Sequence, residues 1–245
     1  MAVAKIARVV GTTAVGAETR LLDIELSDGP LGFSGGQYII VNSGIALPGG
    51  KIAKRAYSIL SSDAEQHRIT LAVRRIGSGP GSNFMHRHEA GGEFEFSGPW
   101  GQYAAPAGLV RSQTLIIATD TGITAAVGLV CGERFRPCLS GCTLVWFVEN
   151  DDYFVSAEFV KKRLPAGIKF IVIQTAPPIG NPDRKVAICN WVSEHLNGAP
   201  PDAAFLSGDG SVLVPLREQL FATGVPDTAV RMETFFNHVI RKAPV

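Results

Sequence analysis

The chain has 245 residues, which is enough for one large domain or two ordinary ones with a sizeable core. Hydrophobic residues make up 46% of it and charged residues 18%, so the composition is that of a globular chain and not of a disordered one. The formal net charge of +1 argues against nucleic acid or an anionic membrane surface as the main partner.

Neither the cysteines nor the apolar stretches indicate a secreted or membrane-spanning protein. The longest apolar stretch, 115–131, is interrupted by polar residues and is shorter than the ~20 residues of a membrane span. The N-terminus lacks the apolar core of a signal peptide. Neither a disulfide framework nor zinc pairs fit the spacing of the four cysteines, which are Cys131, Cys138, Cys142 and Cys189. We therefore expect a cytoplasmic protein without a membrane span.

The first part of the chain, residues 4–104, has the pattern of an antiparallel barrel or sandwich. Short strand-like runs alternate there with clusters of Gly, Pro, Asn and Ser. One helix is predicted among them, beginning at Ser82. The predicted strands cover 5–10, 20–26, 37–41, 56–60, 68–74 and 93–97.

From about residue 106 the pattern changes, because apolar strands now alternate with helical periodicity. This alternation indicates βαβ units and hence a mostly parallel sheet. The sequence therefore predicts two domains, 1–105 and 106–245. Within the second, strands are expected at 114–118, 143–148, 169–174, 203–207 and 230–235, and helices from 122 and at 154–163, 187–196 and 212–222.

The stretch Arg55-Ala56-Tyr57-Ser58 carries side chains that suit a flavin nucleotide. Arg55 offers a planar, permanently charged fork for phosphate, and Tyr57 offers a ring on which a flat heterocycle can stack. Ser58 adds a small donor or acceptor. Taken alone, the same four residues also fit an ordinary strand.

A second stretch, Gly79-Pro80-Gly81-Ser82-Asn83, predicts a phosphate site. Its glycines precede a helix that Ser82 can N-cap, which leaves free backbone N–H groups and the positive end of the helix dipole facing outward. The alternative is a plain capped loop. With Arg55 upstream, the two stretches together would clamp a pyrophosphate from both sides.

The order of the short motifs resembles the ferredoxin–NADP reductase family over nearly the whole chain. The resemblance implies an N-terminal six-stranded antiparallel β-barrel that binds FAD and a C-terminal α/β Rossmann-like parallel sheet that binds NAD(P)H, with FAD between them. It rests on seven motifs in this order: Gly36-Gln37-Tyr38, Arg55-Ala56-Tyr57-Ser58, Gly79-Pro80-Gly81-Ser82, Gly98-Pro99-Trp100-Gly101, Thr121-Gly122-Ile123, Ser207-Gly208-Asp209 and Glu233-Thr234-Phe235.

The resemblance also implies roles on the FAD side. Arg55 would hold the pyrophosphate, Tyr57 would pack on the isoalloxazine ring, and Ser58 would hydrogen-bond near flavin N5. Backbone contacts to the cofactor would come from Val73 and Arg74. At the helix start, pyrophosphate binding would fall to Gly81, Ser82 and Asn83.

On the reductant side, the resemblance places Thr121 and Gly122 in the nucleotide loop. Glu233 and Phe235 would frame the meeting of nicotinamide and flavin. Ser207 stands where the family has a cysteine, and the resemblance gives it a catalytic position together with Ser58 and Glu233. The alternative for Ser207 is a strand-end hydroxyl bonded to the next loop.

Three departures from the family pattern bear on the electron donor and acceptor. Asp120 replaces a glycine of the nucleotide loop, and a carboxylate there would repel a pyrophosphate. Glu149 lies where NADP-using relatives carry a cation, in the stretch 148–152, so NADH is favoured over NADPH. The cysteine spacing does not match a [2Fe–2S] run, so electrons must leave to another molecule.

The expected function is an FAD-dependent NAD(P)H oxidoreductase that passes electrons to a redox partner: ferredoxin, flavodoxin, or a larger reductase or oxygenase complex. Two alternatives stay open on account of Asp120 and Ser207. The chain would then be a flavin-bearing electron-transfer subunit with a degenerate nicotinamide site, or a flavoprotein scaffold without turnover. The run 235–238 is expected either as a lid over the flavin or as a final core strand with a frayed tail.

Overall fold

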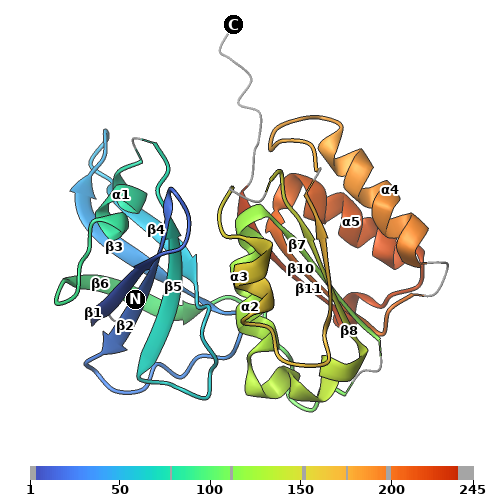
Figure 1. Ribbon diagram of the computed structural model, residues 1–245, viewed down its shortest axis with the longest axis horizontal. Helices are drawn as coiled ribbons and strands as arrows, with labels where there is room; N and C mark the ends of the chain where they lie inside the picture. The colour runs from blue at the N-terminus through green and yellow to red at the C-terminus, as the bar shows by residue number, and fades with distance from the viewer. Residues whose placement is uncertain are drawn as a thin grey trace, which may run out of the picture.

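A computed structural model describes residues 4–77, 79–110, 113–150, 153–174, 176–196 and 200–236, and Figure 1 shows its two halves lying side by side. The first half is built on a six-stranded antiparallel sheet and the second on a five-stranded parallel sheet. The predicted class of fold is therefore confirmed. Residues 237 and 238 of the predicted lid lie outside the described residues.

The first sheet curves into an incompletely closed barrel, with the strand order β4-β3-β6-β1-β2-β5. Its two edge strands approach each other through the isolated bridge between Ile59 and Leu71. Alternating residues point inward and fill the centre, among them Val9, Leu22 and Phe96. The elements are β1 (Lys5–Ala14), β2 (Thr19–Leu26), β3 (Tyr38–Ala46), β4 (Ile52–Ser58), β5 (Arg68–Arg74), α1 (Pro80–His86) and β6 (Glu93–Trp100).

The second sheet has the order β11-β10-β7-β8-β9, with helices on both faces. The strand order reverses between β7 and β10, which is where ligands bind in folds of this kind. The elements are β7 (Thr114–Thr119), η1 (Asp120–Gly122), α2 (Ile123–Val130), η2 (Glu133–Gly141), β8 (Cys142–Phe147), α3 (Ala157–Lys161), β9 (Lys169–Ile173), α4 (Arg184–Leu196), β10 (Ala203–Asp209), α5 (Gly210–Ala222), η3 (Asp227–Ala229) and β11 (Val230–Phe236).

In the second half, one predicted helix is shorter in the structure and one 3₁₀ segment was not predicted. The helix expected at 154–163 is the short α3, because Ser156 caps it by accepting a hydrogen bond from the N–H of Phe159 at 3.1 Å. The 3₁₀ segment η2 was not predicted, since its sequence around Pro137 carries no helical periodicity. Segment η2 runs directly into the first residue of β8, at the amino edge of the parallel sheet.

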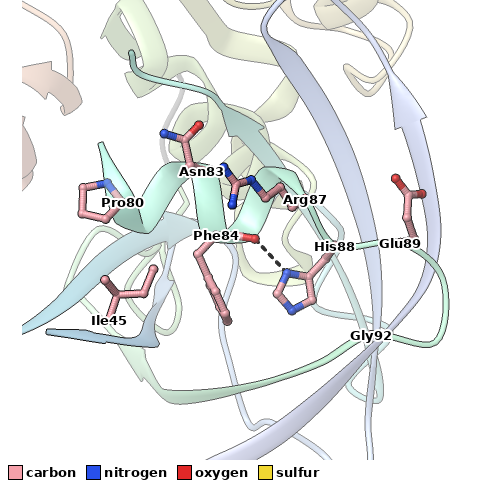
Figure 2. Close-up of a pocket in the computed structure, with 8 residues that line it drawn as sticks. All are labelled: Ile45, Pro80, Asn83, Phe84, Arg87, His88, Glu89 and Gly92. Carbon is pink, nitrogen blue, oxygen red and sulfur yellow. Dashed lines mark hydrogen bonds between the residues drawn. The ribbon is translucent and has the colours of Figure 1, made fainter. Parts of the chain in front are cut away.

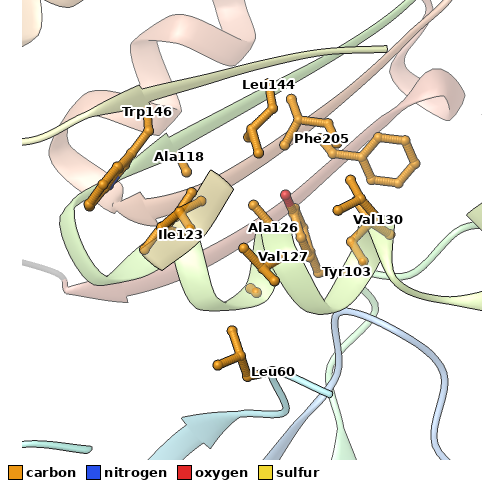
Figure 3. Packing of buried hydrophobic residues seen from close by; sticks show 14 of the residues in the cluster. Leu60, Tyr103, Ala118, Ile123, Ala126, Val127, Val130, Leu144, Trp146 and Phe205 are labelled. Carbon is orange, nitrogen blue, oxygen red and sulfur yellow. The ribbon is translucent and has the colours of Figure 1, made fainter. Parts of the chain in front are cut away.

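Helix α2 lies between the parallel sheet and the first half of the chain. Figure 3 shows Leu60 on one side of α2 and the sheet residues Ala118 and Leu144 on the other. The backbones touch: a Cβ at Gly128 would lie 2.2 Å from the carbonyl oxygen of Ile59. This contact sets how closely the two halves approach each other.

The predicted boundary at 105/106 falls in the segment that connects β6 to β7. Tyr103 and Ala105 are buried in the core around α2, so the chain begins to pack on the second half before residue 106. We keep the boundary at 105/106 as a proposal.

Candidate functional site

A cavity of about 670 Å³ opens between the two halves of the molecule. It lies at the carboxyl edge of the parallel sheet and at the β4–β5 side of the barrel. Residues from both halves line it: Tyr38, Arg55, Ala56, Tyr57, Ser58, Ala72, Arg74, Ile76 and Ser82 from the first, and Thr121, Thr124, Tyr153, Phe154, Ile179, Glu233, Thr234 and Phe235 from the second. Many of the predicted site residues thus meet in one place.

Arg55 reaches the cavity from β4 and lies across the start of α1. A Cβ at Gly81 would be only 2.7 Å from Cγ of Arg55, so the absence of a side chain at residue 81 makes room for the arginine. The Arg55 guanidinium donates to the carbonyl oxygen of Lys54 at 2.7 Å. Arg55 is exposed and has donors left for an anionic ligand.

Tyr57 and Ser58 follow on the same strand. The Tyr57 hydroxyl is buried and has no hydrogen-bond partner among the described residues. Burial raises the pKa of Tyr57 above its usual value, so the hydroxyl stays protonated. An unpartnered buried hydroxyl beside a cavity is what a missing polar ligand leaves behind.

Arg74, at the end of β5, crosses to the second half of the chain. Its guanidinium carbon lies 4.2 Å from the centre of the Tyr153 ring, in a cation–π contact. Its Nε is buried without a partner among the described residues. The preceding residue, Val73, points into the barrel core and does not line the cavity.

The predicted role of Ser82 as a helix cap is wrong. Helix α1 begins at Pro80 with Gly79 in the cap position, and Ser82 lies inside the first turn. Its hydroxyl donates to the carbonyl oxygen of Gly79 at 3.1 Å and accepts from the N–H of Ile76 at 3.2 Å. The reason is that proline at a first helical position sets the start two residues earlier. Ser82 still lines the cavity.

Asn83 lies on the other side of α1. Figure 2 shows it above a second cavity, of about 540 Å³, which Pro80, Phe84 and Arg87 also line. Its side chain donates to the carbonyl oxygen of Gly77 at 2.9 Å. The structure therefore does not bring Asn83 together with the other predicted cofactor residues.

Glu233 and Phe235 bring β11 to the cavity. A Cβ at Gly101 would lie 2.9 Å from Oε2 of Glu233, so the carboxylate packs against the backbone after β6. Burial raises the pKa of Glu233 above that of an exposed glutamate. Thr121 joins them from the β7–α2 turn.

Ser207 and Gly122 pack against each other and do not line the cavity. The buried hydroxyl of Ser207 donates to the carbonyl oxygen of Gly122 at 3.0 Å. A Cβ at Gly122 would lie 2.2 Å from the carbonyl oxygen of Ser207, so only glycine fits there. This contact is the one expected if Ser207 is a strand-end hydroxyl bonded to the next loop, which was the alternative to its catalytic role.

Asp120 is turned away from the cavity, into the domain. Its Oδ2 accepts a hydrogen bond from Nη2 of Arg184 at 2.6 Å, and both side chains are buried. Glu149 lies after β8 and is half-buried. The carboxylate at residue 120 therefore has a cationic partner, which the sequence did not reveal.

The sequence also missed several residues that line the cavity. Tyr153, Phe154 and Ile179 lie in loops that follow β8 and β9, and Thr124 lies on α2. Their positions beyond the carboxyl ends of parallel strands were the only available signal. No spacing rule singles them out.

No described group of three or more His, Cys, Asp or Glu side chains is placed to hold a metal ion. All four cysteines are free thiols, and Cys138 and Cys142 are buried.

The cavity fits a flavin dinucleotide. Arg55, Tyr57 and Arg74 line one space, and the Tyr57 hydroxyl and the Arg74 Nε are buried without partners among the described residues. These groups match a pyrophosphate and a polar heterocycle. The apolar and aromatic remainder suits the faces of a ring system.

A family model for the oxidoreductase FAD-binding domain matches residues 6–104. Among curated proteins, ferredoxin–NADP reductase B of Sorangium cellulosum (strain So ce56) is 39% identical over 119 residues, which are 48% of this chain and 47% of that protein. The ferredoxin reductase component of 3-ketosteroid-9-alpha-monooxygenase from Mycolicibacterium smegmatis (strain ATCC 700084 / mc(2)155) is 24% identical over 86% of this chain and 58% of that protein. The chain thus spans about half the length of these curated relatives.

The fold is also found among solved structures. The ferredoxin reductase in carbazole 1,9a-dioxygenase superposes with a TM-score of 0.77 at 20% identity, over 96% of this chain and 68% of that one. Residues 6–104 thus match an oxidoreductase FAD-binding domain, and the two-sheet fold of the whole chain is that of this solved ferredoxin reductase.

Proposed function

We propose that the chain is an FAD-dependent NAD(P)H oxidoreductase of the ferredoxin-reductase type. One observation carries the proposal: the cavity joins Arg55, Tyr57 and Ser58 of the FAD-binding half to the carboxyl edge of the parallel sheet. The curated relatives, one named a ferredoxin–NADP reductase and the other a ferredoxin reductase component, support the same class of reaction.

On the cofactor side, Arg55 would bind the pyrophosphate by charge-assisted hydrogen bonds, and Gly81 leaves the space that the Arg55 side chain fills. Tyr57 packs on the ring system and Ser58 hydrogen-bonds at its reactive edge. Arg74 would contribute backbone contacts, and its buried Nε has no partner among the described residues. FAD held there would take a hydride from a nicotinamide nucleotide and release the two electrons one at a time.

On the reductant side, Thr121, Glu233 and Phe235 hold the nicotinamide against the opposite wall of the same cavity. Transfer needs the reacting atoms about 3–3.5 Å apart, so both ligands must share a single space that excludes water. The contact between α2 and the first half of the chain keeps the two walls at a fixed separation.

Glu149 supports NADH over NADPH as the reductant. A carboxylate at the end of the second parallel strand can accept a hydrogen bond from a ribose hydroxyl, whereas it would repel a 2′-phosphate. The expected difference is in reductant affinity and not in the chemistry of transfer.

The electron acceptor in this proposal is a redox partner protein: a ferredoxin, a flavodoxin, or a larger reductase or oxygenase complex. The cysteines do not have the spacing of an iron–sulfur cluster, so electrons leave the chain. We also place the protein in the cytoplasm, on the cysteine usage. None of the described helices has the length and apolarity required to cross a membrane.

A second candidate is a flavin-bearing electron-transfer subunit whose nicotinamide site is degenerate. This candidate is favoured by Ser207, because its hydroxyl donates a hydrogen bond to the carbonyl oxygen of Gly122 and Ser207 does not line the cavity. In that case FAD stays bound, but a partner supplies the electrons.

The two candidates are separated by the visible spectrum of the purified chain before and after anaerobic addition of NADH or NADPH. The proposal predicts a yellow protein that bleaches, and bleaches faster with NADH. Yellow protein that ignores both nucleotides supports the second candidate. Colourless protein that cannot be reconstituted with FAD contradicts both, and a clear preference for NADPH contradicts the argument from Glu149.

A further inference from the structure

Asp120 has an unusual backbone for its residue type. Among the residues that the structure describes, it is the one non-glycine residue with positive φ, at +50°. It is the first residue after β7, at the point where the strand order of the sheet reverses. A residue other than glycine adopts a positive φ only at a cost in free energy, so contacts with neighbouring residues must stabilise Asp120 in this conformation.

Those contacts are buried and lead to α4. Asp120 Oδ2 and Arg184 Nη2 are 2.6 Å apart, with 0% and 1% of the two side chains exposed. Arg184 also donates to the carbonyl oxygen of Pro177. The backbone oxygen of Asp120 accepts from Nε1 of Trp146 at 2.9 Å. The carboxylate is thus fixed beneath the turn, while Thr121 and Thr124 of the same turn face the cavity.

Arg184 also balances a concentration of negative charge. Asp209, which caps α5, is buried, and its Oδ2 has no hydrogen-bond partner among the described residues. Asp209 and Glu149 both act on Asp120 to raise its pKa, and burial is the largest cause of a rise to about 6, which Arg184 opposes. Without the guanidinium, three carboxylates would surround the carboxyl edge of β7, β8 and β10.

We propose that Arg184 is a positioning residue of the reductant site, holding Asp120 beneath the β7–α2 turn and cancelling its charge so that the pyrophosphate of a nicotinamide dinucleotide can approach the turn. This inference rests on the proposed function, because it concerns the reductant of that reaction. It explains how the chain tolerates Asp120 in place of the family's glycine: the carboxylate pairs with Arg184, which lies 64 residues further along the chain.

The test is a set of substitutions that are expected to change the affinity for NADH in opposite directions. Arg184→Gln removes the cation that opposes the raised pKa of Asp120, so the carboxylate is unbalanced only at alkaline pH, and we expect the Kd and KM for NADH to rise about tenfold or more there and less at neutral pH. Asp120→Asn leaves an unbalanced cation, and we expect NADH affinity to stay within about threefold or to tighten. The double variant D120N/R184Q removes both charges and should bind NADH better than R184Q alone.

A control and a second readout separate this role from simple stabilisation. Arg217→Gln makes the same change of charge in the exposed pair between Arg217 and Asp227, and it should leave the KM for NADH unchanged. In R184Q, kcat at saturating NADH and the FAD content should stay near the wild-type values. A structural role would instead weaken binding in both single variants, and most in the double variant.

Several results would overturn the inference. They are an R184Q variant with wild-type NADH affinity, or a D120N variant that loses affinity by more than about threefold. If R184Q does not fold, D120N still decides at low ionic strength, where its uncompensated Arg184 charge should tighten NADH binding relative to the wild type, and unchanged affinity there would overturn the inference. A wild-type protein that holds FAD but binds neither nucleotide would overturn the proposed function and this inference together, whereas wild-type binding with unchanged variants would overturn the inference alone.

Discussion

At the scale of single residues, Arg55 and Gly81 depend on each other. The arginine lies where a side chain at residue 81 would be, with its Cγ 2.7 Å from the position of a Cβ. A larger residue at position 81 would displace the guanidinium from the cavity without touching the ligand itself. The two motifs are therefore linked sterically, because Arg55 needs the space at Gly81, as well as through the phosphate that both are proposed to bind.

Replacing Arg55 by alanine is expected to weaken FAD binding. The loss of a charge-assisted contact to phosphate is worth ~1.5–3 kcal/mol, or about ten- to a hundredfold in Kd. The measurement is fluorescence or spectral titration of the apoprotein with FAD. Lys54→Ala is the matched control, because Lys54 is exposed on the same strand and does not line the cavity. Equal flavin affinity in the Arg55 variant and the wild type would contradict the assignment.

At the scale of elements, the cavity is closed by loops that follow strands and not by the strands alone. The end of β5 and the loop after β8 meet through the contact between Arg74 and Tyr153. The two segments are 79 positions apart in the chain and belong to different halves of the molecule. Tyr153 thereby orients the Arg74 guanidinium, whose Nε is buried without a partner among the described residues.

Removing the ring of Tyr153 is expected to loosen this arrangement. A cation–π contact contributes ~0.5–2 kcal/mol, so Tyr153→Ala should raise the Kd for FAD about two- to thirtyfold, because Arg74 is no longer held over the cavity. Tyr153→Phe keeps the ring face and should bind FAD as the wild type does. If the phenylalanine variant loses as much affinity as the alanine variant, the hydroxyl and not the ring face is what matters.

At the scale of the whole molecule, the position of the two halves is set by backbone contact. Gly35, Ile59 and Gly128 bring the first half against α2, and a Cβ at Gly35 would lie 2.4 Å from the carbonyl oxygen of Gly128. Figure 3 shows the apolar side of this junction, where Leu60 meets α2. The cavity keeps its width because neither partner in this contact is a flexible side chain.

Gly128→Ala should therefore destabilise the protein and disturb the cavity. Its Cβ would meet the Ile59 carbonyl oxygen at 2.2 Å, and overpacking of this kind costs ~1–3 kcal/mol. For a chain of this size we expect a fall in Tm of roughly 2–10 °C and weaker FAD retention. Gly11→Ala is the control, since its nearest neighbour would lie at 3.4 Å, an ordinary contact. A Gly128 variant as stable as the control would refute the close-contact argument.

The sequence by itself determined the two kinds of sheet, since strand alternation and βαβ periodicity are local signals, and it determined which residue types suit a flavin. Residues on the faces of strands, such as Arg55 and Tyr57, were predictable because strand geometry fixes where they point. The tertiary structure alone decided the burial of Ser207 and the pairing of Asp120 with Arg184. These depend on contacts between segments distant in the chain, and the charge on Asp120 is balanced only after α4 has packed against the β7–α2 turn.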